Sequence, residues 1–295
     1  MTQTTAKPFV KWAGGKRQLL DVIRTKYPDK IERYCEPFVG SGAVLFDILS
    51  QYQPKDVLIN DVNPELVNTY VQIRDNVEDL ITMLDELQTE YHSKTTDDSR
   101  KEMYLSKRNR FNELKTSNNP PQNLEKAALF IFLNHTCFNG LYRVNANGLF
   151  NVPIGTYKTP TICDTENLAN VSKALQNTRI CCGDYYTCND FIDSNTFVYL
   201  DPPYRPLTPT ANFTSYSADK FDDARQIKLN TFVDKIAAKG AKFVASNSDP
   251  KNVDTTDNFF DTLYAAYNIE RVSAKRHINS KASGRGAITE LLIYN

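Results

Sequence analysis

The stretch "RYCEPFVGSGAVLFDILSQY" (residues 33–52) decides the fold, because a strand pattern turns into a helix pattern within a few residues. Residues 33–38 predict a strand, and "VGSG" predicts a turn. The helix pattern that follows places apolar residues at Val44, Leu45, Ile48 and Leu49. "KDVLINDV" (55–62) predicts a second strand and "NPELVNTYVQIRDN" (63–76) a second helix. This order is typical of a parallel sheet with right-handed crossovers.

The strand–helix alternation stops between about residues 76 and 125, where the pattern predicts two polar helices. A more apolar helix (123–136) and a loop rich in Asn and Gly (137–160) follow. The alternation then resumes with strands predicted within 178–184, 196–201 and 241–249, a helix within 222–240, and two strands joined by a polar loop within 267–295. The simplest arrangement is one α/β domain, 1–70 and 165–295, interrupted by a helical insertion, 71–164.

The composition is ordinary for a globular protein, with 41% hydrophobic and 24% charged residues among 295. Lys and Arg, 35 together, balance 35 Asp and Glu, so binding to nucleic acid would need local basic patches. The chain shows no signal-peptide pattern and no run long enough to span a bilayer. The six cysteines include no C-x-x-C pair, and the three histidines lie elsewhere. We therefore expect a cytoplasmic protein with reduced thiols, no disulfide framework and no metal site.

Two groups of basic residues could supply such patches. One group lies on the insertion, where a solvated helix face explains these residues almost equally well. The other lies near the C-terminus. The candidates are Lys101, Lys107, Arg108, Arg110 and Lys115 on the insertion, and Lys275, Arg276, Lys281 and Arg285 near the end.

The glycine turn predicts a ligand at the end of the first strand. Gly40 and Gly42 let the backbone turn tightly and approach a ligand closely. The full dinucleotide fingerprint needs a third small residue where this chain has Leu45, so a pyrophosphate is not expected. Asp61 ends the second strand, where an acid can bind the ribose hydroxyls of an adenosine-containing cofactor. Asp184 follows the third strand at the same edge of the sheet. The alternative for each is a turn or helix N-cap.

The segment "KPFVKWAGGKRQLL" (7–20) contains G-G-K, but it is not a phosphate loop because the spacing and the final Ser or Thr are missing. Trp12, the single tryptophan, stands between Lys11 and Lys16. A flat ring beside two cations suits a small molecule that carries a carboxylate and a base. Alternatively, Trp12 only anchors the N-terminal segment on the core.

The stretch "VYLDPPYRPL" (198–207) ends a strand with an acid, two prolines and a tyrosine. Neither proline has an N–H to extend the ladder, so Asp201 and Tyr204 must lie at the carboxyl edge of the sheet. Suppose that the ligand is S-adenosylmethionine and that the methyl acceptor is an amino group on an aromatic base. Such an amino group is a poor nucleophile, since its lone pair is delocalised into the ring. The Asp201 carboxylate and the Pro202 carbonyl can accept its two hydrogens, and Tyr204 can stack on the base. The alternative is merely a rigid strand exit.

The chain resembles the Dam/DpnM-like DNA adenine-N6 methyltransferases of the α group. Matching blocks follow one another in the family's order: "FVKWAGGK", "EPFVGSGAVLF", "NDVNPELV", "FNGLYRVNANGLFNVPIG", "DPPYRPLTPTANFTSY" and "SGRGAITELLIYN". The resemblance implies an α/β, Rossmann-like sheet that uses S-adenosyl-L-methionine, with a helical target-recognition insertion. It also implies methylation of a flipped-out adenine in double-stranded DNA, with GATC as the expected site.

The resemblance also implies roles for individual residues. Phe138 can wedge where a base leaves the stack, unless it packs in the core, and Arg143 suits a guanine edge, unless it contacts a phosphate. The expected DNA contacts are Lys11, Phe138, Asn139, Leu141 and Arg143. The expected catalytic residues are Asp201, Pro202, Pro203 and Tyr204. The expected cofactor residues are Trp12, Lys16, Glu36, Phe38, Gly40, Gly42, Asp61, Asp184 and Asp201.

Other functions remain open at this point. The first is methylation of another planar amine, in RNA or a protein glutamine, although related sites there usually begin with Asn. The second is a DNA-binding regulator without turnover, which predicts losses among the cofactor residues. A cognate restriction endonuclease is a further expected partner. "SNSD" (246–249) is interpreted as capping at the sheet edge, with no chemistry.

Overall fold

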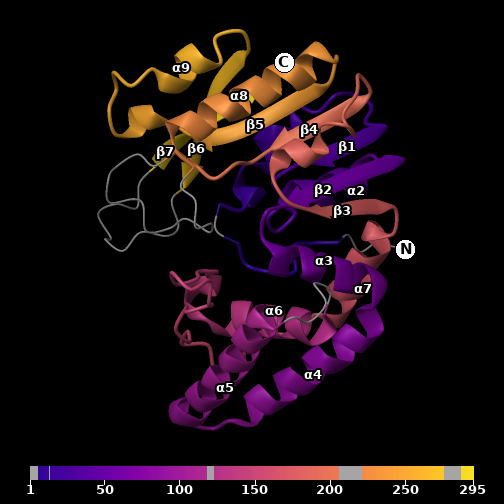
Figure 1. Ribbon diagram of the computed structural model, residues 1–295, viewed down its shortest axis with the longest axis vertical. Helices are drawn as coiled ribbons and strands as arrows, with labels where there is room; N and C mark the ends of the chain where they lie inside the picture. Colours follow the sequence, from indigo (N-terminus) through magenta and orange to yellow (C-terminus); the bar gives the residue numbers. More distant parts are fainter. Residues whose placement is uncertain (1–5, 13, 118–122, 206–220, 276–286) are drawn as a thin grey trace.

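The computed structural model describes residues 6–12, 14–117, 123–205, 221–275 and 287–295. Its centre is a seven-stranded sheet in the order β3-β2-β1-β4-β5-β7-β6 (Figure 1). The strands are β1 (Arg33–Glu36), β2 (Asp56–Asp61), β3 (Thr178–Cys182), β4 (Thr196–Leu200), β5 (Lys242–Ser248), β6 (Asn268–Lys275) and β7 (Ala287–Tyr294). Neighbours from β3 to β5 are parallel, and β7 is antiparallel to both β5 and β6. This confirms the expected Rossmann-like α/β sheet, whose strand order reverses between β1 and β4.

Helices connect the strands and form the insertion. The α-helices are α1 (Leu20–Arg24), α2 (Ala43–Gln51), α3 (Pro64–Asp75), α4 (Val77–Ser93), α5 (Asp97–Thr116), α6 (Leu124–Thr136), α7 (Thr165–Leu175), α8 (Asp223–Ala238) and α9 (Phe259–Leu263). Short 3-10 helices are η1 (Lys16–Gln18), η2 (Phe138–Gly140), η3 (Tyr185–Cys188) and η5 (Pro250–Asn252).

Both faces of the sheet are covered, because alternate side chains of its strands enter different cores. On β4, Phe197 and Tyr199 pack in the core that includes α1, α2 and α3, whereas Val198 and Leu200 pack in the core that includes α8. Parallel strands are normally buried in this way on both faces. Side chains near the end of β4 are therefore held from both sides.

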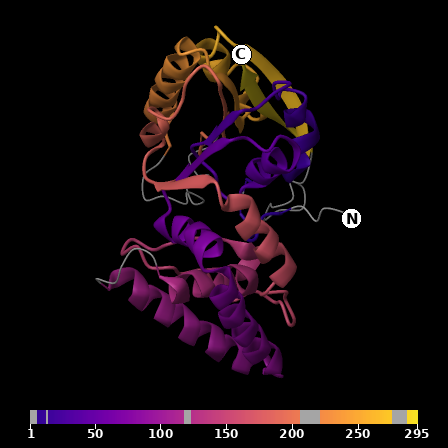
Figure 2. The ribbon, with the colours of Figure 1, turned by 90° about the vertical axis from the view of Figure 1, so that its right-hand side faces the viewer.

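The insertion lies beyond the β3 edge of the sheet, as Figures 1 and 2 show. Its centre is α6, whose residues 126–134 are all buried and which packs against α3, α4 and α5. The expected apolar helix thus forms the core of this region. The division at residues 70 and 165 stays a prediction, since α7 packs back onto α3 and α4.

Two interpretations of the sequence change with the structure. "SNSD" does not follow the fifth strand, because residues 246–248 belong to β5 and only Asp249 caps η5. Helix α7 was not predicted, although Asp164 caps it and Leu168, Val171 and Leu175 are buried at helical spacing. Residues 246–248 are polar but buried, so they differ from the usual apolar pattern of a buried strand.

Several expected features concern the whole chain. Four of the six free cysteines are buried, Cys181 is half-buried and Cys182 is exposed. Among the residues that the structure covers, no helix is long and apolar enough to cross a membrane. The same residues include no group of three or more His, Cys, Asp or Glu able to hold a metal ion.

The glycine turn depends on the missing side chain at Gly42. This residue precedes α2 with φ +75°, and a Cβ there would lie 2.6 Å from the Tyr70 hydroxyl oxygen. That hydroxyl donates a hydrogen bond to the Gly40 carbonyl at 3.0 Å. The turn is therefore packed against α3 with no room for a methyl group.

We expect Gly42→Ala to lower the free energy of unfolding by about 3 kcal/mol, from left-handed strain and overpacking together. Gly148→Ala is the matched control, because Gly148 has φ +74° and nothing within 4 Å of an added Cβ. It should cost about 1 kcal/mol, the strain alone. Urea unfolding measures both values. Equal losses would show that packing against Tyr70 does not matter.

A buried carboxyl group lies beneath the same turn. Glu36 is 2% exposed, accepts a hydrogen bond from the Tyr34 hydroxyl at 2.7 Å, and bonds the backbone N–H of Leu45 in α2. Burial nevertheless raises the pKa of Glu36 well above its usual value. Folding therefore favours the protonated form.

This shift predicts a pH dependence of stability. Because the folded-state pKa of Glu36 is raised, its contribution is present below the unfolded value of about 4.3 and is lost as pH rises toward the folded value. Glu36→Gln removes this titration. We expect the variant to gain stability relative to the wild type as pH rises above about 4.3. Urea unfolding of both proteins across pH measures the difference, and parallel profiles would contradict it.

Candidate active site at the carboxyl edge of the sheet

The N-terminal segment runs along the glycine turn and reaches the end of β4. A Cβ at Gly40 would lie 3.0 Å from Cδ1 of Trp12, so the indole ring packs directly on the turn. Lys16 is 4% exposed, and its Nζ lies 2.8 Å from Asp201 Oδ1 and donates to the Gly14 carbonyl at 2.6 Å. The structure thus joins Trp12, Lys16, Gly40 and Asp201 in one site.

Trp12 also has the anchoring role that was the alternative. Its ring stacks on Tyr142 of the insertion, with centroids 6.0 Å apart and planes 27° apart. It lies 6.3 Å from the ring of Phe130 in α6. Anchoring and a place beside the turn are therefore compatible.

Asp61 binds the glycine turn and does not cap a helix. Its Oδ2 accepts the Gly40 N–H at 3.0 Å, and its Oδ1 accepts the Asn63 N–H at 2.9 Å. Asn63 is the N-cap of α3, accepting from the N–H groups of Glu65 and Leu66. Burial raises the pKa of Asp61 despite these hydrogen bonds.

Two expected cofactor residues have other local partners. Asp184 is exposed and caps η3 by accepting the Tyr186 N–H at 2.9 Å, as the turn alternative supposed. Phe38 packs against Tyr185 at 5.4 Å and Phe221 at 6.2 Å between ring centroids. Both follow strands of the sheet, but neither contact points to a ligand.

The residues after β4 are fixed by neighbours on three elements. Asp201 Oδ1 accepts a second hydrogen bond, from Ser246 Oγ of β5 at 2.9 Å. The Pro203 carbonyl accepts one from Gln226 of α8 at 3.3 Å. The Tyr204 hydroxyl donates to Glu290 of β7 at 2.5 Å.

The Tyr204 ring lies in a charged environment. Lys16 Nζ is 4.7 Å from its centroid. Burial, with the charges of Asp201 and Glu290, raises the pKa of Tyr204 well above its usual value. The ring therefore stays a neutral phenol.

Arg205 anchors the chain beyond the tyrosine. Its Nε and Nη1 each lie 2.6 Å from a carboxylate oxygen, of Asp223 and Asp257 respectively. Its guanidinium carbon lies 4.4 Å from the Phe259 ring centroid. These contacts hold the chain just after Tyr204 against the start of α8 and the segment before α9.

The loop after α6 carries the expected DNA contacts. Phe138 is 50% exposed, so the core-packing alternative is wrong for this residue. Asn139 is exposed with φ 54°, and Leu141 is half-buried. Arg143 is exposed, and its Nε donates to Asn151 Oδ1 at 2.8 Å.

Lys11 belongs to the same surface. Asn134 at the end of α6 accepts the Lys11 N–H and donates to its carbonyl, both at 2.8 Å. Asn134 also donates to the Gly140 carbonyl of the loop at 2.9 Å. The Lys11 ammonium lies 4.0 Å from the Tyr157 ring centroid.

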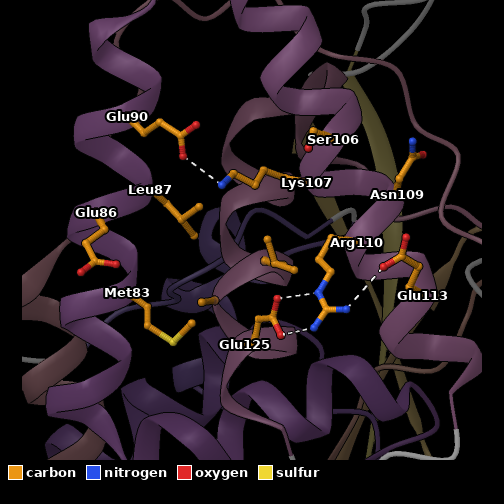
Figure 3. A pocket seen from close by; sticks show the side chains of 12 residues that line it. Met83, Glu86, Leu87, Glu90, Ser106, Lys107, Asn109, Arg110, Glu113 and Glu125 are labelled. Carbon is orange, nitrogen blue, oxygen red and sulfur yellow. Dashed lines mark hydrogen bonds and ion pairs between the residues drawn. The ribbon is translucent and has the colours of Figure 1, made fainter.

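Most of the candidate basic patch on the insertion is paired internally. Lys107 and Arg110 line a cavity of about 890 Å³ between α4, α5 and α6 (Figure 3). Lys107 Nζ lies 2.9 Å from a carboxylate oxygen of Glu90, and Arg110 Nε lies 2.7 Å from one of Glu125. Lys115 is half-buried, and its Nζ lies 3.1 Å from a carboxylate oxygen of the buried Glu65. The structure thus favours internal pairing over DNA contact for these three residues. The candidates Arg276, Lys281 and Arg285 lie outside the described residues, as does the Lys275 side chain.

Sequence reasoning missed Ser246, Gln226 and Glu290. Each stands on an element whose pattern is otherwise explained by packing. One signal existed, since Glu290 interrupts an apolar strand in "AITELLIYN". Ser246 and Gln226 carry no comparable signal, because serine and glutamine are common at helix and strand surfaces.

Comparison with known proteins identifies the family of this chain. The model of the D12 class N6 adenine-specific DNA methyltransferase family matches residues 12–278. The type II methyltransferase M.MjaIII of Methanocaldococcus jannaschii is 47% identical, over 98% of this chain and 99% of that one. M1.LlaDCHI of Lactococcus lactis is 37% identical (98% and 95% covered), and a DNA adenine methylase of Haemophilus influenzae is 33% identical (97% and 92%). The chain therefore belongs to the D12 class of adenine-specific DNA methyltransferases.

Proposed function

We propose that this enzyme transfers a methyl group from S-adenosyl-L-methionine to N6 of an adenine within GATC, after flipping the base out of double-stranded DNA. The observation that carries the proposal is the 2.8 Å contact between Lys16 and Asp201. It joins the segment proposed for the cofactor to the residues proposed for catalysis. The family and the names of the relatives support the reaction, whereas the GATC site rests on the resemblance of the loop.

The residues around the turn fit the chemical groups of this cofactor. Lys16 is a buried cation able to pair with the carboxylate of the methionine part. Asp61 is an acceptor able to bind ribose hydroxyls, and Trp12 offers a flat ring beside the turn. Gly40 is half-buried beside Trp12, whereas Gly42 is buried and shapes the turn, with Glu36 beneath it. Phe38 and Asp184 are weaker candidates because their side chains have other partners.

The catalytic residues act by positioning. When bound, S-adenosyl-L-methionine supplies an electrophilic methyl group on a sulfonium. Asp201 can accept one hydrogen of the adenine amino group, and the Pro202 carbonyl can accept the other, which frees the nitrogen lone pair for attack on the methyl group. The nitrogen loses one of these hydrogens as a proton during or after the transfer. The Pro203 carbonyl already accepts a hydrogen bond from Gln226, and Tyr204 can stack on the extruded base.

The recognition loop offers side chains for reading and opening the duplex. Phe138 is an exposed apolar wedge, and Arg143 is an exposed donor fork held by Asn151. Asn139, Leu141 and Lys11 flank them. Internal pairing of the α5 cations suggests that base-edge contacts near this loop matter more than a basic helix face.

The first experiment uses labelled S-adenosyl-L-methionine with two duplexes, one containing GATC and one with its adenine replaced. We expect label only in the GATC duplex, and loss of label with Asp201→Ala or Tyr204→Ala. Asp29→Ala, at an exposed acid outside the site, should keep full activity. Label in both duplexes would refute the target. No label in DNA, with cofactor still bound, would favour RNA, a protein or a regulator without turnover.

The second experiment tests base reading by Arg143. Arg143→Ala should reduce discrimination at one guanine by about 1–3 kcal/mol, because a bidentate donor to that base is lost. Asn151→Ala should reduce discrimination at the same guanine by a smaller amount, since it only removes a side-chain partner of the Arg143 guanidinium. Lys101→Ala, an exposed cation on α5, is the control. Methylation rates on duplexes substituted at each GATC position measure the effect, and a uniform loss at all positions would contradict it.

We also propose a cognate restriction endonuclease as a partner, a cytoplasmic location, and domain boundaries at residues 70 and 165.

A further inference from the structure

We propose that Ser246, oriented by Tyr199, is a positioning residue that fixes the carboxylate of Asp201 for methyl transfer. The inference rests on the catalytic role proposed above for Asp201. It assigns a function to the polar end of β5, which the sequence suggested was only a cap.

The sheet register places these side chains together. On the parallel pair β4 and β5, Leu200 is the partner of Ala245. One residue further along, Asp201 comes opposite Ser246. Side chains two residues apart share a face of a strand, so Tyr199 lies on the same side as Asp201. Ser246 is fully buried, with 0% exposure.

The shortest of three contacts sets the direction of the hydrogen bonds. Ser246 Oγ lies 2.9 Å from Asp201 Oδ1, 3.2 Å from the Tyr199 hydroxyl and 3.5 Å from the Leu200 carbonyl. A carboxylate only accepts, and a serine hydroxyl has one hydrogen. If Ser246 gives that hydrogen to Asp201, Tyr199 must donate to Ser246.

Tyr199 is suited to be the donor. It is 1% exposed, and burial together with the charge of Asp201 raises the pKa of its phenol well above the usual value. The hydroxyl therefore keeps its hydrogen. The result is a chain of donors, Tyr199 to Ser246 to Asp201, inside the sheet core.

This series of hydrogen bonds selects one orientation of the Asp201 carboxylate. The terminal torsion of an aspartate is broad, so its two oxygens are not placed by rotamer preference. Lys16 and Ser246 both bond Oδ1, which leaves the Oδ2 edge to accept an amino hydrogen. Lys16 is also proposed to pair with the cofactor. Ser246 has no such second role, so its hydrogen bond to Asp201 does not depend on the cofactor.

The test is Ser246→Ala, measured as a single-turnover rate on a GATC duplex. We expect the rate to fall about tenfold or more, the effect of losing a hydrogen bond to a charged group. The dissociation constants for S-adenosyl-L-methionine and for the duplex should stay within about twofold. Ser172→Ala is the matched control, because Ser172 is a buried serine whose hydroxyl bonds the Arg74 carbonyl at 3.3 Å.

Two further variants separate positioning from folding. Ser246→Thr keeps the hydroxyl and should recover most of the rate. Tyr199→Phe should lower the rate about threefold in the wild type, and have no effect once Ser246 is Ala, because the chain is already broken. Thermal unfolding of each variant shows whether it is folded, and Tyr199→Phe gives a test with little change in volume.

The outcomes are distinguishable. If Asp201→Ala remains active, the proposed active site is wrong. If Asp201→Ala is inactive but Ser246→Ala keeps the wild-type rate, only this inference is overturned. Losses of rate and cofactor affinity that match each other, or an equal effect of Tyr199→Phe in both backgrounds, would mean a structural role and also overturn it.

Discussion

The buried ammonium group of Lys16 is the constraint on which the site depends. A charge that is 4% exposed needs compensation, and here the Asp201 carboxylate and the Gly14 carbonyl provide it. Pairing these groups holds the N-terminal segment against the end of β4. The same segment then keeps Trp12 on the glycine turn. One ion pair therefore sets the spacing between the residues proposed to bind the cofactor and those proposed for catalysis.

Local patterns were sufficient to predict the parts of the site that end strands. Two prolines stop β4 whatever surrounds it, so the edge position of Asp201 follows from the sequence. The positions of the glycine turn and Asp61 could also be predicted, because each directly follows a predicted strand. Only the structure showed that Asn63 is the cap of α3. The antiparallel position of β7 between β5 and β6 could not be predicted, because no local pattern indicates which edge of the sheet the last strands will pair with.

The other residues depend on contacts between distant parts of the chain. Ser246 is 45 residues from Asp201, and Glu290 is 86 residues from Tyr204, so no local pattern connects them. The cations of α5 show a related limit. A helical pattern indicates which face is polar, but not that Lys107 and Lys115 meet carboxylates of α4 and α3.

The attachment of the N-terminal segment to α6 has a consequence for how such enzymes acquire new target sites. Asn134 binds both backbone groups of Lys11, and His135 Nε2 lies 3.0 Å from the Phe9 carbonyl. The loop after α6, proposed above to read bases, and residues 6–12 are therefore joined by hydrogen bonds, although they are distant in the sequence. Recombination that replaced the insertion alone would join it to a foreign N-terminal segment. A modular exchange of specificity between relatives has to carry both pieces.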